Sequence, residues 1–369
     1  MNKPVLIGSE IYRRSSFGGA HPLAIARVST VMDMVMALDL CAKDDFQVAP
    51  TAKPALLRQF HDSEYIGALQ RIERDQQATG RDRNKFNIGT LSNPIFRHMY
   101  KRPATSVGSS LIGAEYVATR GGRAYALGGG LHHGMAGYAN GFCFLNDLVF
   151  AIRRLRALGL RRVAYVDFDA HHPDGVEAAF PDEKDLLIIS THEENRWPFL
   201  GTLSDNCKER IMNIPLPAGC HDSEYNLFFD ELILPALLQF APEVIVVQGG
   251  ADALLNDPLS RLALSNNSLW RALRGLLGCS KRILLTGGGG YNPWTVARLW
   301  TGFWAILNDQ PVPQQITPSA KEILQSLTWN RKSHLPVRML ETLHDPPTRG
   351  PIRPVIHSSI KHLKKLHGL

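Results

Sequence analysis

Short apolar runs rich in β-branched residues recur along the chain, and a polar or glycine-rich turn follows each of them. These runs are Ala124–Leu127, Val163–Val166, Leu186–Ile189, Val244–Val247 and Ile283–Leu285. Runs of this length without polar alternation are typical of strands buried on both faces of a parallel sheet. Between and after them lie segments with apolar residues at helical spacing: Asn146–Leu158, Ser223–Phe240, Asn267–Leu277 and Pro293–Ile306. The alternation predicts an α/β fold with a single open, mainly parallel sheet and helices on both faces.

The two ends of the chain are less regular than its middle. Near the start, Ile25–Leu40 and Ala55–Ile72 have helical spacing, whereas the polar segment Arg81–Leu91 is expected to be a loop. After about Pro311 the chain is rich in proline and polar residues, so we expect this segment to wrap the core. We therefore predict one domain over residues 1–369, with the functional motifs within about 20–310.

The strongest chemical signal follows the second apolar run, where the sequence is Asp167-Phe168-Asp169-Ala170-His171. Alternate side chains of a strand point the same way, so Asp169 and His171 could share one ion. Carboxylate and imidazole are zinc ligands, and Asp252, which follows a separate strand, could supply a third. An isolated Asp-x-His also occurs in helix caps and surface hydrogen bonds. Carboxylates that end so apolar a strand need a compensating partner, which favours a metal site.

Two further stretches carry candidate catalytic groups after predicted strands, where open α/β sheets bind ligands. His132 and His133 follow three glycines and could exchange protons near a metal, although both could instead bind metal or belong to a plain loop. Their carboxylate partners could be Asp167 and Asp174. Tyr291 follows four glycines and could stabilise an oxyanion. A phosphate-binding loop is the alternative there, but no GxGxxG or GxxxxGK pattern is present.

Composition bears on the protein's partners and location more than on its chemistry. The formal charge of +7 is attributed to general solubility, because no basic stripe with interleaved aromatic residues predicts a nucleic-acid partner. The five cysteines form no CxxC pair, which favours reduced thiols and a cytoplasmic location. No run of about 18 apolar residues and no signal-peptide pattern is seen, so we expect no membrane association.

The motifs in order resemble the zinc-dependent histone deacetylase family of the arginase/deacetylase superfamily. The likeness rests on Gly128–Gly134, Gly141–Asp147, Val166–Gly175, Gly250–Asp252 with Asp257-Pro258, and Gly287–Asn292. Within that family the chain is most similar to class I-like bacterial deacetylases of the acetoin-utilisation type. The resemblance implies the arginase/deacetylase fold and hydrolysis of acyl-lysine amides in proteins.

The resemblance also implies a role for each matching residue. One zinc ion would be held by Asp169, His171 and Asp252. His132 and His133 would be the catalytic pair, with Asp167 and Asp174 as partners, and Tyr291 would polarise the acyl carbonyl. The tunnel for the substrate would be lined by Phe142, Phe199 and Leu131, with Arg27 in a channel beneath the site. A potassium ion would lie near Asp167, Asp169, His171, Ser190 and Thr191.

The sequence departs from the family pattern at a few positions. Pro173 replaces a glycine between His172 and Asp174, and Leu131 stands where aromatic residues are common. The segment Asn87–Pro94 lacks the aspartate that relatives use to grip the substrate backbone. The choice of substrate is therefore expected to differ from that of peptide deacetylases.

Several alternatives stay open at this point. An acetylpolyamine or another small acetylated amine could be the substrate. An arginase-like ureohydrolase with two manganese ions is less well supported, because Ala253-Leu254-Leu255 after Asp252 offers no second carboxylate cluster. A catalytically inactive acyl-lysine binder is disfavoured, because no expected catalytic residue is missing. The sequence leaves the oligomeric state open.

Overall fold

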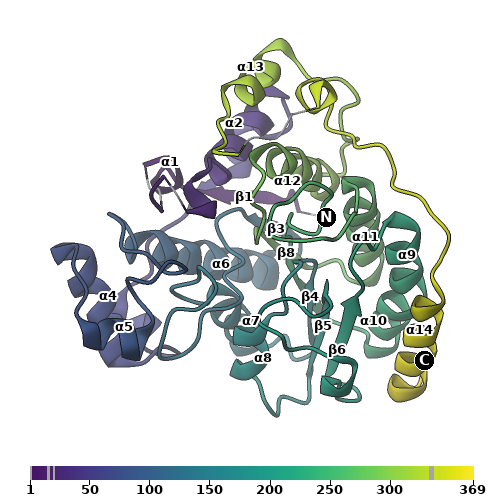
Figure 1. The fold of residues 1–369 in the computed structure, drawn as a ribbon, viewed down its shortest axis with the longest axis horizontal. Helices are drawn as coiled ribbons and strands as arrows, with labels where there is room; N and C mark the ends of the chain where they lie inside the picture. The colour runs from purple at the N-terminus through teal and green to yellow at the C-terminus, as the bar shows by residue number, and fades with distance from the viewer. Residues whose placement is uncertain (1, 15–16, 20, 332–335) are drawn as a thin grey trace.

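The computed structural model describes residues 2–14, 17–19, 21–331 and 336–369. One parallel sheet of eight strands runs through it in the order β2-β1-β3-β8-β7-β4-β5-β6 (Figure 1). The strands are β1 (Val5–Gly8), β2 (Phe46–Val48), β3 (Arg123–Ala126), β4 (Val163–Asp167), β5 (Leu186–Glu193), β6 (Ile211–Leu216), β7 (Val244–Gln248) and β8 (Ile283–Thr286). The predicted single parallel sheet is thus confirmed.

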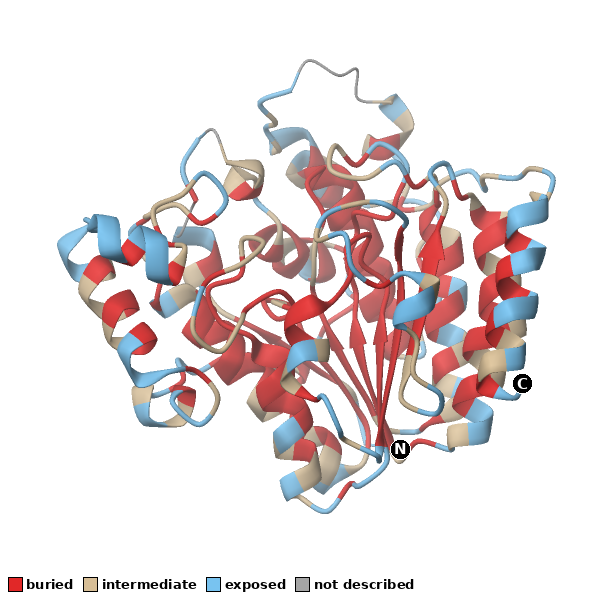
Figure 2. Cartoon of the chain, turned by 60° about the horizontal axis from the view of Figure 1, so that its bottom comes forward, coloured by how far each residue is buried: buried red, intermediate tan, exposed pale blue. Residues whose placement is uncertain are grey.

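Helices cover both faces of the sheet. One face packs against α2, α9, α10, α11 and α12, and the other against α6, α7 and α8, so the strands are buried on both sides (Figure 2). The longer helices are α2 (Val28–Ala37), α4 (Ser63–Asp75), α6 (Lys101–Arg120), α7 (Asp147–Ala157), α11 (Asn266–Cys279), α12 (Pro293–Leu307) and α14 (Pro354–His367). The shorter ones are α1 (Ile11–Arg14), α3 (Pro54–Leu57), α5 (Gly80–Phe86), α8 (Asp174–Ala179), α9 (Asp222–Phe228), α10 (Leu234–Phe240) and α13 (Pro318–Ser326), with a π-helical turn at Phe229–Ile233 between α9 and α10.

The five predicted strands are all present, but three strands at or near the sheet edges escaped the sequence pattern. β1 has only four residues, and β2 has only three, of which Gln47 and Val48 are exposed. In β6 the apolar run is interrupted by Asn213 and Pro215. Proline is tolerated there because β6 is an edge strand, where one side of the backbone needs no ladder hydrogen bond.

The prediction of a loop over Arg81–Leu91 is wrong in its first half. Residues Gly80–Phe86 form α5, which begins with a capping box between Thr79 and Asp82. The hydrophobic pattern does not predict α5, because most of this helix faces solvent and its buried apolar contact comes from Phe86. The remainder of the segment, from Asn87 onward, is irregular.

The C-terminal part of the chain lies against the helical layers. α13 packs against α2, and α14 packs against α9 and the π-helical turn (Figure 1). At the start of α14, Arg353 forms a bidentate ion pair with the buried Glu224 of α9, with nitrogen–oxygen distances of 2.7 and 2.6 Å. Within the described part of the chain, no helix combines the length and apolar character that crossing a membrane requires.

Two helical glycines should respond in opposite ways to alanine. A Cβ atom on Gly108 of α6 would lie 1.9 Å from the backbone oxygen of Pro50, whereas one on Gly67 of α4 would meet no atom within 4 Å. We expect Gly108→Ala to destabilise the fold by about 1–3 kcal/mol through overpacking. Gly67→Ala should stabilise it by roughly 1 kcal/mol. Urea denaturation of both variants measures this, and equal midpoints would contradict it.

Candidate catalytic site

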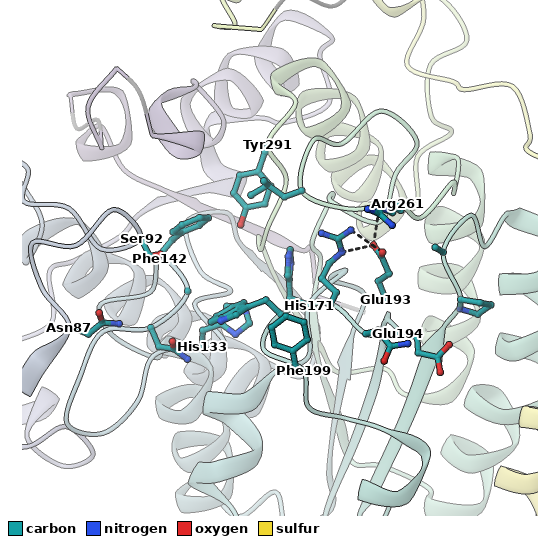
Figure 3. A pocket seen from close by; sticks show the side chains of 18 residues that line it. Asn87, Ser92, His133, Phe142, His171, Glu193, Glu194, Phe199, Arg261 and Tyr291 are labelled. Atoms are coloured by element: carbon teal, nitrogen blue, oxygen red, sulfur yellow. Dashed lines mark hydrogen bonds and ion pairs between the residues drawn. The ribbon is translucent and has the colours of Figure 1, made fainter. Parts of the chain in front are cut away.

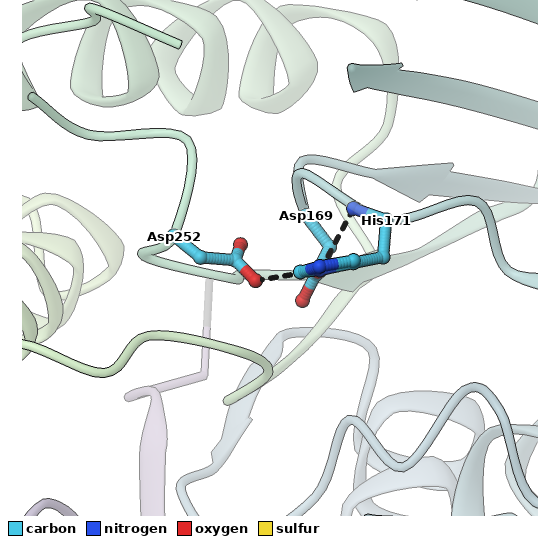
Figure 4. A group of neighbouring side chains, drawn as sticks. All are labelled: Asp169, His171 and Asp252. Atoms are coloured by element: carbon cyan, nitrogen blue, oxygen red, sulfur yellow. Dashed lines mark hydrogen bonds and ion pairs between the residues drawn. The ribbon is translucent and has the colours of Figure 1, made fainter. Parts of the chain in front are cut away.

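Two carboxylates and one imidazole converge at the carboxyl ends of neighbouring strands. Nδ1 of His171 lies 3.1 Å from Oδ1 of Asp169 and 3.0 Å from Oδ2 of Asp252 (Figure 4). Asp169 and His171 follow β4, and Asp252 follows β7, which pairs with β4 in the sheet. All three residues are buried. Among the described residues, they form the group of side chains that could hold a metal ion.

The donor set fits a small divalent cation of the zinc type. Two oxygens and a nitrogen bound to one ion at about 2.0–2.2 Å lie about 3–3.5 Å apart in tetrahedral geometry, which agrees with the spacing here. The second oxygen of each carboxylate is held elsewhere: Asp169 accepts from Gln248 and from the Gly289 amide, each at 2.7 Å, and Asp252 accepts from the Ala170 amide at 2.9 Å. The cluster is therefore built to hold positive charge at one point.

The electrostatics of the cluster agree with this assignment. Burial acts against a charged imidazole, yet the hydrogen bonds and charges of Asp169 and Asp252 raise the pKa of His171 to about 10. Burial and the neighbouring Asp169 raise the pKa of Asp252 to about 6. Two buried carboxylates so close together require a compensating cation, which a proton on His171 or a metal ion can supply.

Two histidine–carboxylate pairs stand beside the cluster, as predicted for His132 and His133. Nδ1 of His132 lies 2.8 Å from Asp167, and Nδ1 of His133 lies 2.6 Å from Asp174. The imidazole centroids are 4.0 Å apart. Because each Nδ1 is engaged by a carboxylate, Nε2 is the nitrogen left for chemistry, and His133 presents its ring to the cavity (Figure 3).

The two imidazoles differ in basicity although they are adjacent. Burial and then the charge of His132 lower the pKa of His133 to about 4, although the hydrogen bond to Asp174 acts in the opposite direction. Burial also acts against a charged His132, but Asp167 and Asp169 outweigh it and raise its pKa to about 9. At neutral pH His132 is therefore an imidazolium, whereas His133 is a neutral imidazole that can accept a proton.

Tyr291 faces the same cavity from the glycine loop after β8. Its amide donates to the buried Asp257 at 2.7 Å, and its ring packs edge-on against Phe142 at 5.7 Å. Burial, followed by the charges of Asp252 and Asp169, holds the pKa of the Tyr291 hydroxyl well above its ordinary range, so the phenol keeps its proton. Arg27 stabilises this loop by donating to the carbonyl oxygens of Gly288 and Gly290 at 2.8 and 3.3 Å.

A cavity of about 780 Å³ opens above these groups, with His133, His171 and Tyr291 in its lining. Phe142 and Phe199 line it, and both have a positive φ, +68° and +62°, which is uncommon for aromatic residues. Such backbone strain persists where surrounding contacts impose it. For Phe142 the contact is the buried Asn93, whose side-chain oxygen accepts from the Phe142 amide at 3.1 Å.

The other predicted site residues lie close by but not all in this cavity. Leu131 and Arg27 line a separate inner cavity of about 40 Å³. Ser190 of β5 is in register with Asp167 of β4, and the Thr191 hydroxyl donates to the Asp167 carbonyl oxygen at 3.1 Å. Pro173 precedes α8 and leaves the contact of Asp174 with His133 intact.

Sequence reasoning missed the residues that hold the site residues in place. Gln248 binds Asp169, and the Asn140 side chain donates to Asp174 at 2.8 Å. Asp147 accepts from the amides of Gly130 and Leu131, at 3.0 and 2.8 Å, and so fixes the turn that leads into His132. Trp197 packs edge-on against His133 with centroids 4.7 Å apart. The signal for Gln248 was its place at the end of an apolar strand; Asn140 and Trp197 lie in irregular segments that carry none.

The fold and the site together bring a metal-ligand cluster, two histidine–carboxylate pairs and a tyrosine to one cavity. A model of the Histone deacetylase domain matches residues 21–307, which is more than half of the chain. The chain therefore belongs to the histone deacetylase family. It is a deacetylase that acts on acyl-lysine or related amide substrates.

Relatives and solved structures agree with this assignment. The Acetoin utilization protein AcuC of Bacillus subtilis is 31% identical over 86% of this chain and 85% of its own length. Histone deacetylase RPD3 of Saccharomyces cerevisiae is 33% identical over 80% of this chain and 69% of its own. Crystal structures of an HDAC homolog from Aquifex aeolicus and of an HDAC homolog complexed with SAHA each superpose with a TM-score of 0.93 at 34% identity. Each of these matches covers 98% of this chain and 100% of the other.

Removing the Asn93 side chain should loosen the part of the cavity lining that Phe142 forms. Asn93 also donates to the carbonyl oxygens of Asn87 and Ala139, at 3.1 and 3.2 Å. Asn93→Ala therefore leaves three backbone groups without that partner, one in the buried Ala139 and two in the half-buried Asn87 and Phe142. We expect kcat/KM for an acetyl-lysine peptide to fall about tenfold and the fold to lose about 1–3 kcal/mol. The control is Leu91→Ala, at a neighbouring residue that is 97% exposed and does not line the cavity. An equal effect of both variants on kcat/KM would contradict the role of Asn93.

Proposed function

We propose that this deacetylase uses a single zinc ion, held by Asp169, His171 and Asp252, to hydrolyse the amide of acyl-lysine in proteins. The observation that carries the proposal is the meeting of this cluster with two His–Asp pairs and a protonated phenol at one cavity. Zinc bound there would supply Lewis-acid polarisation of the acyl carbonyl and a more acidic water molecule.

Each side chain around the cavity has one task in the proposed reaction. His133, neutral and oriented by Asp174, accepts a proton from the attacking water and later delivers it to the leaving amine. His132, charged and paired with Asp167, stabilises negative charge that develops nearby. Tyr291 donates its hydroxyl proton in a hydrogen bond to the acyl oxygen as that oxygen becomes negative. Phe142 and Phe199 enclose the aliphatic stem of the lysine.

Release of acetate from an acetyl-lysine peptide tests the proposal directly. The purified protein should lose activity after treatment with a strong chelator and regain it on addition of one equivalent of zinc per chain. Elemental analysis should give one zinc, because a single cluster of ligands is present among the described residues. Two manganese ions per chain together with urea release from a guanidino substrate would support the arginase-like alternative instead.

Replacing Tyr291 by phenylalanine tests the oxyanion role. Tyr291→Phe removes the donor but keeps the ring that packs against Phe142, so substrate binding should be largely retained. Turnover should fall by about two to three orders of magnitude, as for other lost oxyanion donors. Steady-state kcat and the affinity for an acetyl-lysine peptide are the two measurements, and a kcat near that of the wild type would refute the assignment.

Three finer predictions remain part of the proposal. Acetylpolyamines or small acetylated amines stay the alternative substrates, and comparing kcat/KM for peptides and for acetylated polyamines decides between them.

The adjacent oxygens of Asp167, Ser190 and Thr191 support a potassium ion there. The five unpaired cysteines are compatible with the cytoplasmic location that their spacing predicts.

A further inference from the structure

The cavity of about 780 Å³ extends to one side of the catalytic groups. Away from Asn87 and Phe142, its lining continues over a side groove formed by Glu193, Glu194, Arg196, Pro217, Ala218 and Arg261. In Figure 3 the labelled Arg261 and Glu193 lie across the cavity from Asn87 and Phe142, with His171 between the two sides. A substrate whose acyl group reaches His171 therefore has a charged wall beside the part that stays outside.

The backbone of Arg261 is fixed from two directions. Its amide donates to Oε2 of Glu193 at 2.7 Å, and its carbonyl oxygen accepts from the amide of Gly219 at 2.8 Å. Glu193 is itself buried at the end of β5, so the sheet positions the residue that holds Arg261. The anchor fixes the Cα position of an arginine whose side chain is exposed.

The charges of the side groove do not cancel at Arg261. Glu193 is neutralised by Arg196, which forms a bidentate pair with distances of 2.6 and 2.9 Å. Among the residues that the structure describes, no carboxylate forms an ion pair with the Arg261 guanidinium, and no acceptor binds it. Glu194 lines the same groove but is not within ion-pair distance. Arg261 thus offers a free guanidinium fork, which matches a carboxylate in geometry and charge.

We propose that Arg261 is a specificity residue that binds a carboxylate of the acylated substrate outside the tunnel. The inference rests on the proposed deacetylase function and names its substrate class: acylated amines that carry an anionic group near the scissile amide. The carboxylate can come from an acidic residue next to acyl-lysine in a peptide, or from the free α-carboxylate of an acylated amino acid.

Binding to a variant that does not consume the probe tests the proposal. In the Tyr291→Phe background, the affinities of two acetyl-lysine peptides with blocked ends are compared, one with glutamate and one with glutamine beside the acetyl-lysine. A second arm compares Nε-acetyl-lysine that has a free α-carboxylate with its carboxamide. The glutamate peptide, the free acid or both should bind about three- to tenfold more tightly, and added salt should reduce the difference.

Three further variants in that background assign the preference to Arg261. Arg261→Gln should abolish it, and Arg261→Lys should retain part of it, because lysine keeps the charge without the fork. Arg58→Gln, at an exposed arginine outside the cavity, should leave it unchanged. A preference that survives Arg261→Gln, or no preference in either arm, overturns the proposal. Failure of the wild type to release acetate from every probe tells instead against the proposed function.

Discussion

The site depends on two carboxylates, Asp169 and Asp252, that are buried side by side and need a positive charge between them. Leaving such groups unpaired costs several kcal/mol each, so the fold must bring a cation to the point between them. His171 supplies one nitrogen there, and its raised pKa shows how strongly that point attracts positive charge. The parallel sheet makes the arrangement possible, because β4 and β7 are neighbours whose carboxyl ends meet at one edge.

A second set of buried polar groups fixes the positions of the first. Gln248 binds Asp169, Asn140 binds Asp174 and Asp257 holds the backbone of Tyr291. Each of these contacts gives a buried polar group a hydrogen-bond partner, so the same contacts contribute to stability and to orientation. The strained backbone of Phe142 is maintained in the same way by Asn93. The catalytic geometry is therefore a consequence of satisfying buried hydrogen-bonding groups.

The central strands and the candidate ligands could be predicted because their signals are local. An apolar run that ends in Asp167-Phe168-Asp169 is visible in the sequence, and parallel pairing brings such ends together. The edge strands could not be predicted, since β2 has three residues and β6 contains Pro215. The partners of the site residues were missed for another reason. Asn93 and Trp197 act through contacts between distant segments, and neither periodicity nor spacing records such contacts.

The cavity divides into a floor that the sheet determines and a rim that loops determine. The floor groups follow sheet strands, so their positions are tied to strand register and tolerate little change. On the rim, Phe199 is 69% exposed and contributes no charge to the substrate. Arg261 differs because its backbone is bound to Glu193, the last residue of β5. A charge at the rim that is anchored to the sheet can discriminate between substrates without disturbing the floor. Because rim and floor are separate, one catalytic arrangement can act on amines whose neighbouring groups differ.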